Sequence, residues 1–395
     1  MRKSVLSVLA AAAVVALAGC SASPTIADSG SKNTIKIGAW VTTSGPIAVS
    51  GVPQAAGTQA YFDMINASGG CNGHQIDWIT QDNAYDPQQT IQIARSLVQQ
   101  DNVIAIVSAY GTATSEAAFS YVLDQSKVPI LNTAGGASSW YTPSRDNLFG
   151  VEALYEDQGA ALGSWAAEEE ATKIVVVHSD PDAFVNVAKN VAPGAKSVNS
   201  SVNVELLPVK YHSTDYSPVV QQVQSKNADA VVLILSPEEA AAYLKEAKLQ
   251  GLDSQTYGYA PDASTATLTL AGDAAEGFHT LSLVRAPDGN TPELKEYQAA
   301  MAKYAPTQPI DFVTETGFAR AKAFCEVVKT IQGDVTSESI SDAYTNASSV
   351  VTGLLSDMSF SADTHIGTRQ VLKLVVKDGK FTEVDGEFYA PTRTN

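Results

Sequence analysis

Residues 34–70 have the sequence TIKIGAWVTTSGPIAVSGVPQAAGTQAYFDMINASGG, which contains a strand, a loop and a helix in succession. Apolar side chains occupy every second position from Ile35 to Val41, which is the spacing of one strand face. From Val52 to Met64 they recur at every fourth position, the spacing of one helix face, and Gly69-Gly70 marks the helix end. The stretch therefore predicts a buried strand followed by a helix.

The same alternation continues twice along the chain. Further strands of the first series are expected at 75–80, 103–108 and 128–131, with helices that begin behind Asp86-Pro87 and near Ser115. A second series starts near Leu148, with strands expected at 173–178, 204–209, 230–235 and 255–259 and helices at 156–169, 184–196, 216–226 and 237–250. The remainder predicts strands at 277–283, 370–376 and 380–384 and helices at 291–304, 314–331 and 337–346. Short apolar strands separated by amphipathic helices form parallel sheets with helices on both faces, so the sequence predicts an α/β fold with two doubly wound lobes.

The composition excludes several classes of protein. The chain has 25 Lys and Arg against 42 Asp and Glu, a formal net charge of −17. A nucleic acid partner is therefore not expected, because phosphate neutralisation needs basic patches, and the same charge argues against electrostatic docking on anionic lipid. Three cysteines in 395 residues exclude a disulfide-dense scaffold.

The first residues have the pattern of a secretory signal. Arg2 and Lys3 precede an apolar stretch, Val5 to Ala18, which is shorter than the roughly 20 residues of a membrane span. The following Leu17-Ala18-Gly19-Cys20 resembles the bacterial lipobox, which implies a lipid anchor on Cys20; an ordinary signal peptide or a short core helix is the alternative. We thus expect a signal peptide at 1–19, a flexible tether at 20–33 and an extracytoplasmic, membrane-anchored protein.

The sequence carries no motif typical of catalysis. No two of the five histidines lie close enough for the H-E-x-x-H spacing of a zinc site, and neither a G-x-S-x-G elbow nor a Walker loop is present. The glycine-rich segment 69–73 ends a helix instead of opening one, so it predicts a turn and not a phosphate site. We therefore expect a protein that is not an enzyme and that holds no metal or cofactor.

Two loops at strand ends are better candidates for binding. Residues 110–115, YGTATS, lie between an apolar strand and a helix, and their glycine, hydroxyls and helix N–H groups suit a carboxylate or another polar group. Simple capping of the helix by Thr114 or Ser115 is the alternative. Residues 132–138, NTAGGAS, follow the next strand in the same way. Ligands bind outside the carboxyl ends of such strands, which favours both loops.

Several segments together resemble one family over about 36–376, nearly all of the chain after the signal. They are Thr43-Ser44-Gly45-Pro46, Asn66 to Gly70, Asp82 to Pro87, Thr214 to Val219 with Ala228 to Leu233, and Ala271 to Gly277. In this order they are similar to the type I solute-binding proteins of branched-chain amino-acid ABC transporters, the Leu/Ile/Val-binding family. The resemblance implies two lobes joined by three crossing strands, with a ligand cleft between them.

The resemblance also implies lobe boundaries and a function. It places lobe 1 at 34–151 and 284–352, lobe 2 at 152–283 and 353–390, and the crossings near 150–153, 281–285 and 351–355. It implies a monomer that captures a small solute, an amino acid or a related carboxylate or amide, and delivers it to an ABC permease. A sensing subunit for a membrane receptor, a binder of urea, amides or aromatic acids, and a two-lobed hydrolase are the alternatives; the hydrolase lacks a nucleophile–base pair.

Candidate site residues follow from the resemblance position by position. They are Ser50, Tyr110, Gly111, Thr112, Ala134, Gly135, Gly136, Phe184 and Asp262. The chain departs from the family at Gly136, where a hydroxyl is usual, and at Ser236, where an aromatic ring is usual. Asp262 is expected to hold a ligand ammonium, with a solvated loop aspartate as the alternative. Tyr85 and Tyr155 are further candidates for the cleft.

Cys71 and Cys325 are the cysteines that remain once Cys20 is lipidated. The resemblance places both in lobe 1, and an extracytoplasmic location permits oxidation. A disulfide between them is one outcome, and two separate thiols, with Cys325 packed in the core, is the other.

Overall fold

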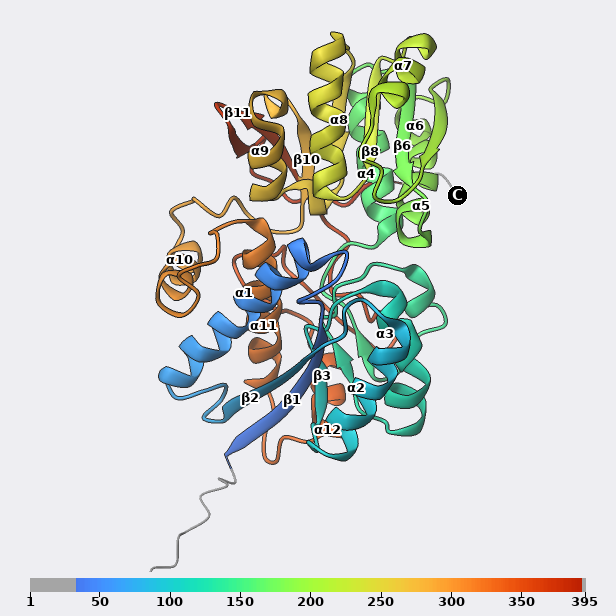
Figure 1. Cartoon of the computed structure of the whole chain (residues 1–395). Helices are drawn as coiled ribbons and strands as arrows, with labels where there is room; N and C mark the ends of the chain where they lie inside the picture. The colour runs from blue at the N-terminus through green and yellow to red at the C-terminus, as the bar shows by residue number, and fades with distance from the viewer. Residues whose placement is uncertain (1–32, 393–395) are drawn as a thin grey trace, which may run out of the picture. The chain divides into compact units, whose positions relative to one another are not determined.

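The computed structural model of the protein describes residues 33–392. This part of the chain contains two β-sheets with helices packed on them (Figure 1). The structure thus confirms the predicted α/β fold with two lobes. The predicted signal peptide, most of the tether and Cys20 lie outside the described residues.

The first sheet has five parallel strands in the order β2-β1-β3-β4-β5. Its strands are β1 (Thr34–Val41), β2 (Gln75–Asp82), β3 (Ala105–Val107), β4 (Ile130–Leu131) and β5 (Leu148–Phe149). The helices of this lobe are α1 (Ala48–Ala67), α2 (Pro87–Gln99), α3 (Thr112–Phe119), α10 (Pro292–Tyr304), α11 (Phe312–Val328) and α12 (Ser337–Thr345). The last three come from far along the sequence, and α11 packs directly on α1 (Figure 1).

Glycines allow α1 and α11 to pack closely. A Cβ atom added at Gly57 would lie 1.9 Å from the carbonyl oxygen of Thr314, and one added at Gly317 would lie 2.0 Å from that of Gln54. Real Cβ atoms never approach this closely, so only glycine fits at either position. The contact holds α11 in the first lobe although more than 200 residues separate it from α1.

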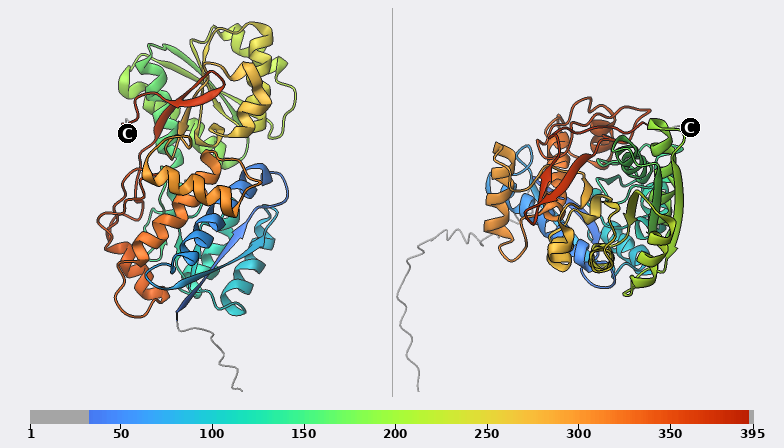
Figure 2. Two further views of the ribbon diagram at one scale, coloured as in Figure 1. Left: turned by 90° about the vertical axis from the view of Figure 1, so that its left-hand side faces the viewer. Right: turned by 90° about the horizontal axis from the view of Figure 1, so that it is seen from above.

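The second sheet has seven strands in the order β12-β11-β10-β9-β8-β6-β7. They are β6 (Lys173–Ser179), β7 (Asn203–Val209), β8 (Ala230–Ile234), β9 (Gln255–Gly258), β10 (His279–Ser282), β11 (Leu372–Lys377) and β12 (Lys380–Glu383). Pairing is parallel up to β10, and the hairpin β11–β12 adds two antiparallel strands at the edge (Figure 2).

The helices of the second lobe cover both faces of this sheet. They are α4 (Tyr155–Glu168), α5 (Asp182–Lys189), α6 (Val191–Val198), α7 (Ser217–Lys226), α8 (Pro237–Gln250) and α9 (Thr265–Ala271). Side chains alternate between faces along a strand, so Val176 of β6 joins the core of α4 to α6, whereas Val175 and Val177 join the core of α7 and α8. Both faces are therefore buried, as the apolar strands predicted.

The prediction of a single helix at 184–196 is wrong, because the chain forms two helices there, α5 and α6, with Asn190 between them. Pro193 lies three residues into α6. A proline has no N–H and its ring collides with the carbonyl of the residue four positions earlier, here Lys189, so one continuous helix is disfavoured.

The cap of α2 is as the sequence predicted. Asp86 accepts hydrogen bonds from the backbone N–H groups of Gln88 and Gln89 at 2.7 and 3.0 Å, and Pro87 begins the helix. We expect Asp86→Ala to lower the free energy of unfolding by about 1 kcal/mol. Urea denaturation of both proteins measures this, and an unchanged midpoint would show that the cap contributes nothing; Asp86→Asn, which keeps an acceptor, is the control.

The segments that join the two lobes contact one another. Gly150 pairs with Ile366, and Val284 pairs with Leu355. His365 stacks on Phe149 of β5 at 4.3 Å between ring centres. This contact packs His365 against the first sheet, and the crossing expected at 351–355 stays a prediction.

Cys71 and Cys325 form a disulfide in the structure, with their Cα atoms 5.4 Å apart. Cys71 lies in the turn before β2 and Cys325 in the last turns of α11, and both are fully buried. The bridge therefore links the beginning of the first lobe to the helix that returns to it. Within residues 33–392, no helix has the length and apolar character needed to cross a membrane.

Candidate ligand-binding site

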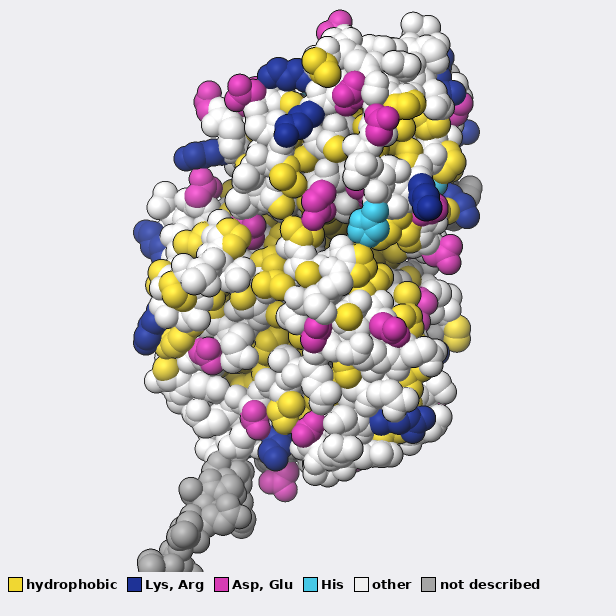
Figure 3. Space-filling view, viewed as in Figure 1, with side chains coloured by type: hydrophobic (Ala, Val, Ile, Leu, Met, Phe, Trp, Pro, Cys, Tyr) yellow, Lys and Arg dark blue, Asp and Glu magenta, His cyan; other side chains and the backbone are white. Residues whose placement is uncertain are grey.

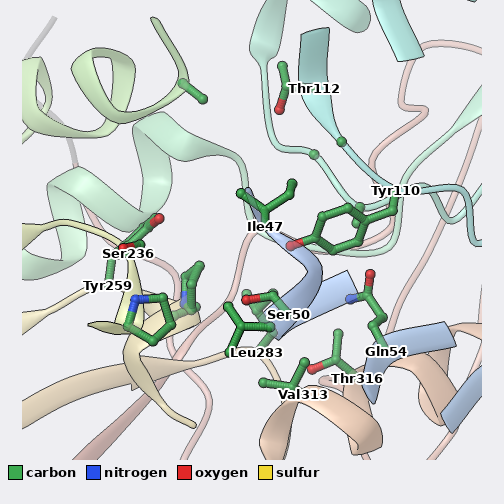
Figure 4. Close-up of a pocket in the computed structure, with 18 of the residues that line it drawn as sticks. Ile47, Ser50, Gln54, Tyr110, Thr112, Ser236, Tyr259, Leu283, Val313 and Thr316 are labelled. Carbon is green, nitrogen blue, oxygen red and sulfur yellow. The ribbon is translucent and has the colours of Figure 1, made fainter. Parts of the chain in front are cut away.

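A cavity of about 1300 Å³, including space open to solvent, lies between the two lobes. Apolar side chains gather in the hollow between the lobes (Figure 3). One part of the lining comes from α11, and the rest comes from loops and first helix turns that follow strands of both lobes, among them β1, β3 and β4 in the first and β6, β8 and β9 in the second (Figure 4). These are carboxyl ends of parallel strands, where α/β sheets bind ligands.

Most of the residues expected from the sequence line this cavity. They are Ser50, Tyr110, Gly111, Thr112, Ala134, Gly135 and Phe184. Gly136 does not; its carbonyl oxygen accepts a hydrogen bond from the Tyr155 N–H at 2.8 Å instead. The structure thus brings seven of the nine together, and their contact with a ligand stays a prediction.

Glycine is required where the loop after β3 enters α3. Gly111 has a φ of 106°, and a Cβ atom there would lie 2.7 Å from the Tyr85 ring. Thr114 and Ser115 do not cap α3, because Thr114 donates to the Tyr110 carbonyl at 3.0 Å and Ser115 accepts from the Trp40 indole. The N-terminal end of α3 therefore lies at the cavity without a side-chain cap.

Five tyrosines line the cavity and come from both lobes. They are Tyr85, Tyr110, Tyr155, Tyr211 and Tyr259. Burial raises the pKa of every one of these hydroxyls, so all five remain protonated donors at neutral pH. The Tyr155 hydroxyl and Thr112 Oγ1 lie 2.6 Å apart, a hydrogen bond between the second and the first lobe.

Sequence reasoning missed two of these tyrosines. Tyr259 directly follows β9 and Tyr211 comes two residues after β7, so their places at strand ends were a signal that could have found them. Phe184 packs against both, with ring centres 5.5 Å from Tyr211 and 6.0 Å from Tyr259. The three rings form an aromatic wall on the second lobe.

A buried ion pair forms part of the first-lobe lining. Glu152 pairs with Nη2 of Arg320 on α11, and its other oxygen accepts from the Gly135 N–H at 2.9 Å. The two side chains are 8% and 3% exposed. Nε and Nη1 of Arg320 have no hydrogen-bond partner among residues 33–392. No local sequence pattern signals this pair, because 168 residues separate its members.

Asp262, expected to anchor an ammonium group, does not line the cavity. Its neighbours Pro261 and Ala263 do, but the short 3-10 helix Ala260–Asp262 turns the aspartate into the protein, beside Gly258. The side chain is fully buried and neither carboxyl oxygen has a partner among the described residues. Burial, with a smaller effect of Glu239, raises its pKa well above the usual range. The structure thus places Asp262 outside the cavity lining, and its contact with a ligand ammonium stays an untested prediction.

The pH dependence of stability reports on Asp262. Because the pKa is raised in the folded state, the unfolded chain loses its proton first, near pH 3.9, and stability falls as the pH rises above that value. We expect Asp262→Asn to be more stable than the wild type by about 1–3 kcal/mol at pH 7.5, and the gain to shrink toward pH 4. Urea denaturation across this range measures it; a gain that does not change with pH would contradict the burial of an ionisable group.

The geometry defines a two-lobed protein with a cleft at the strand ends, and a sequence comparison identifies its family. A model described as "Periplasmic binding protein" matches residues 34–380. The chain therefore belongs to the periplasmic binding protein family, and the resemblance drawn from the sequence motifs is confirmed.

Named relatives include the Leu/Ile/Val-binding protein of Escherichia coli K12, 25% identical over 245 residues, 62% of this chain. The match spans 66% of that relative, just under two thirds of its length. The leucine-, isoleucine-, valine-, threonine- and alanine-binding protein of Pseudomonas aeruginosa is 24% identical over 269 residues, 67% of this chain and 69% of its own.

Solved structures share the fold. A branched-chain amino acid ABC transporter protein from Thermus thermophilus with bound valine has a TM-score of 0.79 at 19% identity and covers 91% of this chain and 97% of its own. An R. palustris solute-binding protein in complex with benzoate has a TM-score of 0.76 at 18% identity and covers the same shares. The family matched is one of binding proteins, which fits a role other than catalysis.

Proposed function

We propose that the protein is the extracytoplasmic solute-binding subunit of an ABC importer. The observation that carries the proposal is a cavity lined by strand-end loops from both lobes, in a chain of the periplasmic binding protein family. The open form would bind solute on one lobe, and closure would add contacts from the other and shift the population to the closed state. The bond between Thr112 and Tyr155 joins the two lobes and is a contact that opening of the cleft would break. A permease in the membrane would recognise that arrangement.

The solute is a small organic molecule, an amino acid or a related carboxylate or amide. Supporting this are the N-terminal end of α3 at the cavity and the five tyrosine hydroxyls, which supply hydrogen-bond donors, and the aromatic wall, which suits an apolar body. The named relatives bind branched-chain amino acids, and one structural neighbour holds benzoate.

A thermal-shift screen of amino acids, small amides and aromatic acids tests the function. A ligand at 100 times its dissociation constant stabilises the folded state by about 2.7 kcal/mol, which gives a clear shift in Tm. The solute should be recovered unchanged after incubation. If no solute of a broad library stabilises the protein, or if a product forms, the proposed function is wrong.

We further propose that the protein is a monomer anchored to the membrane through lipid on Cys20. Each buried CH₂ of an acyl chain contributes about 0.8 kcal/mol, so several chains on one residue hold a protein firmly. The support is the sequence Leu17-Ala18-Gly19-Cys20 behind an apolar stretch.

Changing Cys20 tests the anchor directly. We expect Cys20→Ala to move the protein from the membrane fraction to the soluble fraction, because the lipid would be its only attachment. Cell fractionation and immunoblotting measure the distribution, with Ser21→Ala, next to the lipidation site, as the matched control. Unchanged membrane association of the Cys20 variant would refute the lipid anchor.

A further inference from the structure

Two carboxylates line the cavity, Glu152 and Glu238, and neither of them is free to hold a buried ammonium group. Glu152 already pairs with Arg320 and accepts a hydrogen bond from the Gly135 N–H. Glu239 accepts from the Ser179 hydroxyl at 3.0 Å, the Ser236 N–H at 3.0 Å and the His212 N–H at 2.8 Å. Asp262 lies behind the cavity lining, beside Gly258.

The other carboxylate of the lining, Glu238, is exposed to solvent in the first turn of α8. A charge in that position keeps its hydration and interacts weakly with another charge. An α-ammonium enclosed in the cavity would therefore lose its water without gaining a carboxylate partner, which is costly.

The first-lobe end of the cavity favours an anion instead. Hydroxyl donors of Ser50 and Tyr110 lie there, and Thr112 at the N-terminal end of α3 lines the same cavity (Figure 4). Arg320 adds a guanidinium with two nitrogens that have no partner among residues 33–392. Burial raises the pKa of Tyr110, so its hydroxyl stays protonated and can donate to a carboxylate.

The carboxylate and the ammonium of an α-amino acid must lie close together at this end of the cavity. An α-ammonium is attached to the carbon next to the carboxylate, so it would lie near the same guanidinium, whose Nε and Nη1 are donors and offer it no acceptor. Tyr110 directs its hydroxyl, a hydrogen-bond donor, into the cavity (Figure 4).

We propose that the solute held in this cavity is a small monocarboxylate with an apolar or aromatic body and no α-ammonium group. The carboxylate lies at the first-lobe end beside Tyr110 and α3, and the body packs against Phe184, Tyr211 and Tyr259. This inference rests on the proposed function, since it names the class of solute for the same cavity.

Matched pairs of probes that differ only in the ammonium group test the inference. They are L-leucine with 4-methylpentanoate, and L-phenylalanine with 3-phenylpropanoate. Binding to the full chain, stripped of solute by unfolding and refolding, is measured by calorimetry. At least one acid without the amine should bind about tenfold or more tightly than its amino acid. Equal or tighter binding of both amino acids overturns the inference and leaves the proposed function standing.

A tyrosine variant tests the position of the carboxylate. Tyr110→Phe should weaken binding of the better acid about tenfold or more, because it removes a donor to a charged group. Tyr243→Phe is the matched control, since Tyr243 is buried on α8, its hydroxyl has no partner among residues 33–392, and it does not line the cavity. An unchanged affinity of the Tyr110 variant, or binding of 3-phenylpropanamide without either acid, overturns the inference. Absence of binding by every solute, the broad screen included, would refute the proposed function as well.

Discussion

The Arg320→Met variant is expected to have a free energy of unfolding about 3–5 kcal/mol lower than that of the wild type. The change removes the guanidinium that pairs with Glu152 and leaves a carboxylate that is 8% exposed in the cavity wall. The remaining bond, from the Gly135 N–H, does not balance the charge. A buried charge without its partner costs far more than the pair itself contributes, so the loss measures the cost of the orphaned carboxylate.

Urea denaturation monitored by circular dichroism measures the loss. The double variant Glu152→Gln/Arg320→Met is the matched control, and it should recover a large part of the stability because no charge remains buried. If the double variant is as unstable as Arg320→Met alone, the effect comes from lost packing and not from the charge. A loss below about 1 kcal/mol in the single variant would contradict the pairing.

Loss of the disulfide is expected to cost about 2–5 kcal/mol. Cys71 and Cys325 are 254 residues apart in the sequence, so the bridge closes a very long loop in the unfolded chain. In the chain-entropy account such a cross-link restricts the unfolded ensemble strongly and stabilises the folded state. Both cysteines are fully buried, so reductant should act slowly on the native protein and rapidly on the unfolded one.

The double variant Cys71→Ala/Cys325→Ala, compared with the wild type by urea denaturation, measures this contribution. Dithiothreitol should lower the midpoint of the wild type and leave that of the double variant unchanged. Thiol counting on the denatured, unreduced chain should detect neither Cys71 nor Cys325. Two free thiols at these positions, or a reductant effect that is the same in both proteins, would show that they are not paired.

Much of the fold follows from local patterns in the sequence. The spacing of apolar residues placed nearly every strand and helix within a few residues of its observed position, because burial of one face imposes a period that short segments already display. The break between α5 and α6 had a local signal as well, in Pro193. The loops at 110–112 and 134–135 were identified because glycine and hydroxyl residues directly follow buried strands.

Other features were decided by the tertiary structure alone. The sequence placed Asp262 in a cleft loop, but only the packing of the second lobe turns its side chain away from the cavity. Glu152 and Arg320 meet across 168 residues, and Tyr110 shares its cavity with Tyr211 and Tyr259 of the other lobe. By itself the sequence determined the strands, the helices and the loops that carry binding groups, since these depend on neighbours within a few positions. Which groups face one another, and which charge is left without a partner, depends on how distant segments pack, and no local pattern records that.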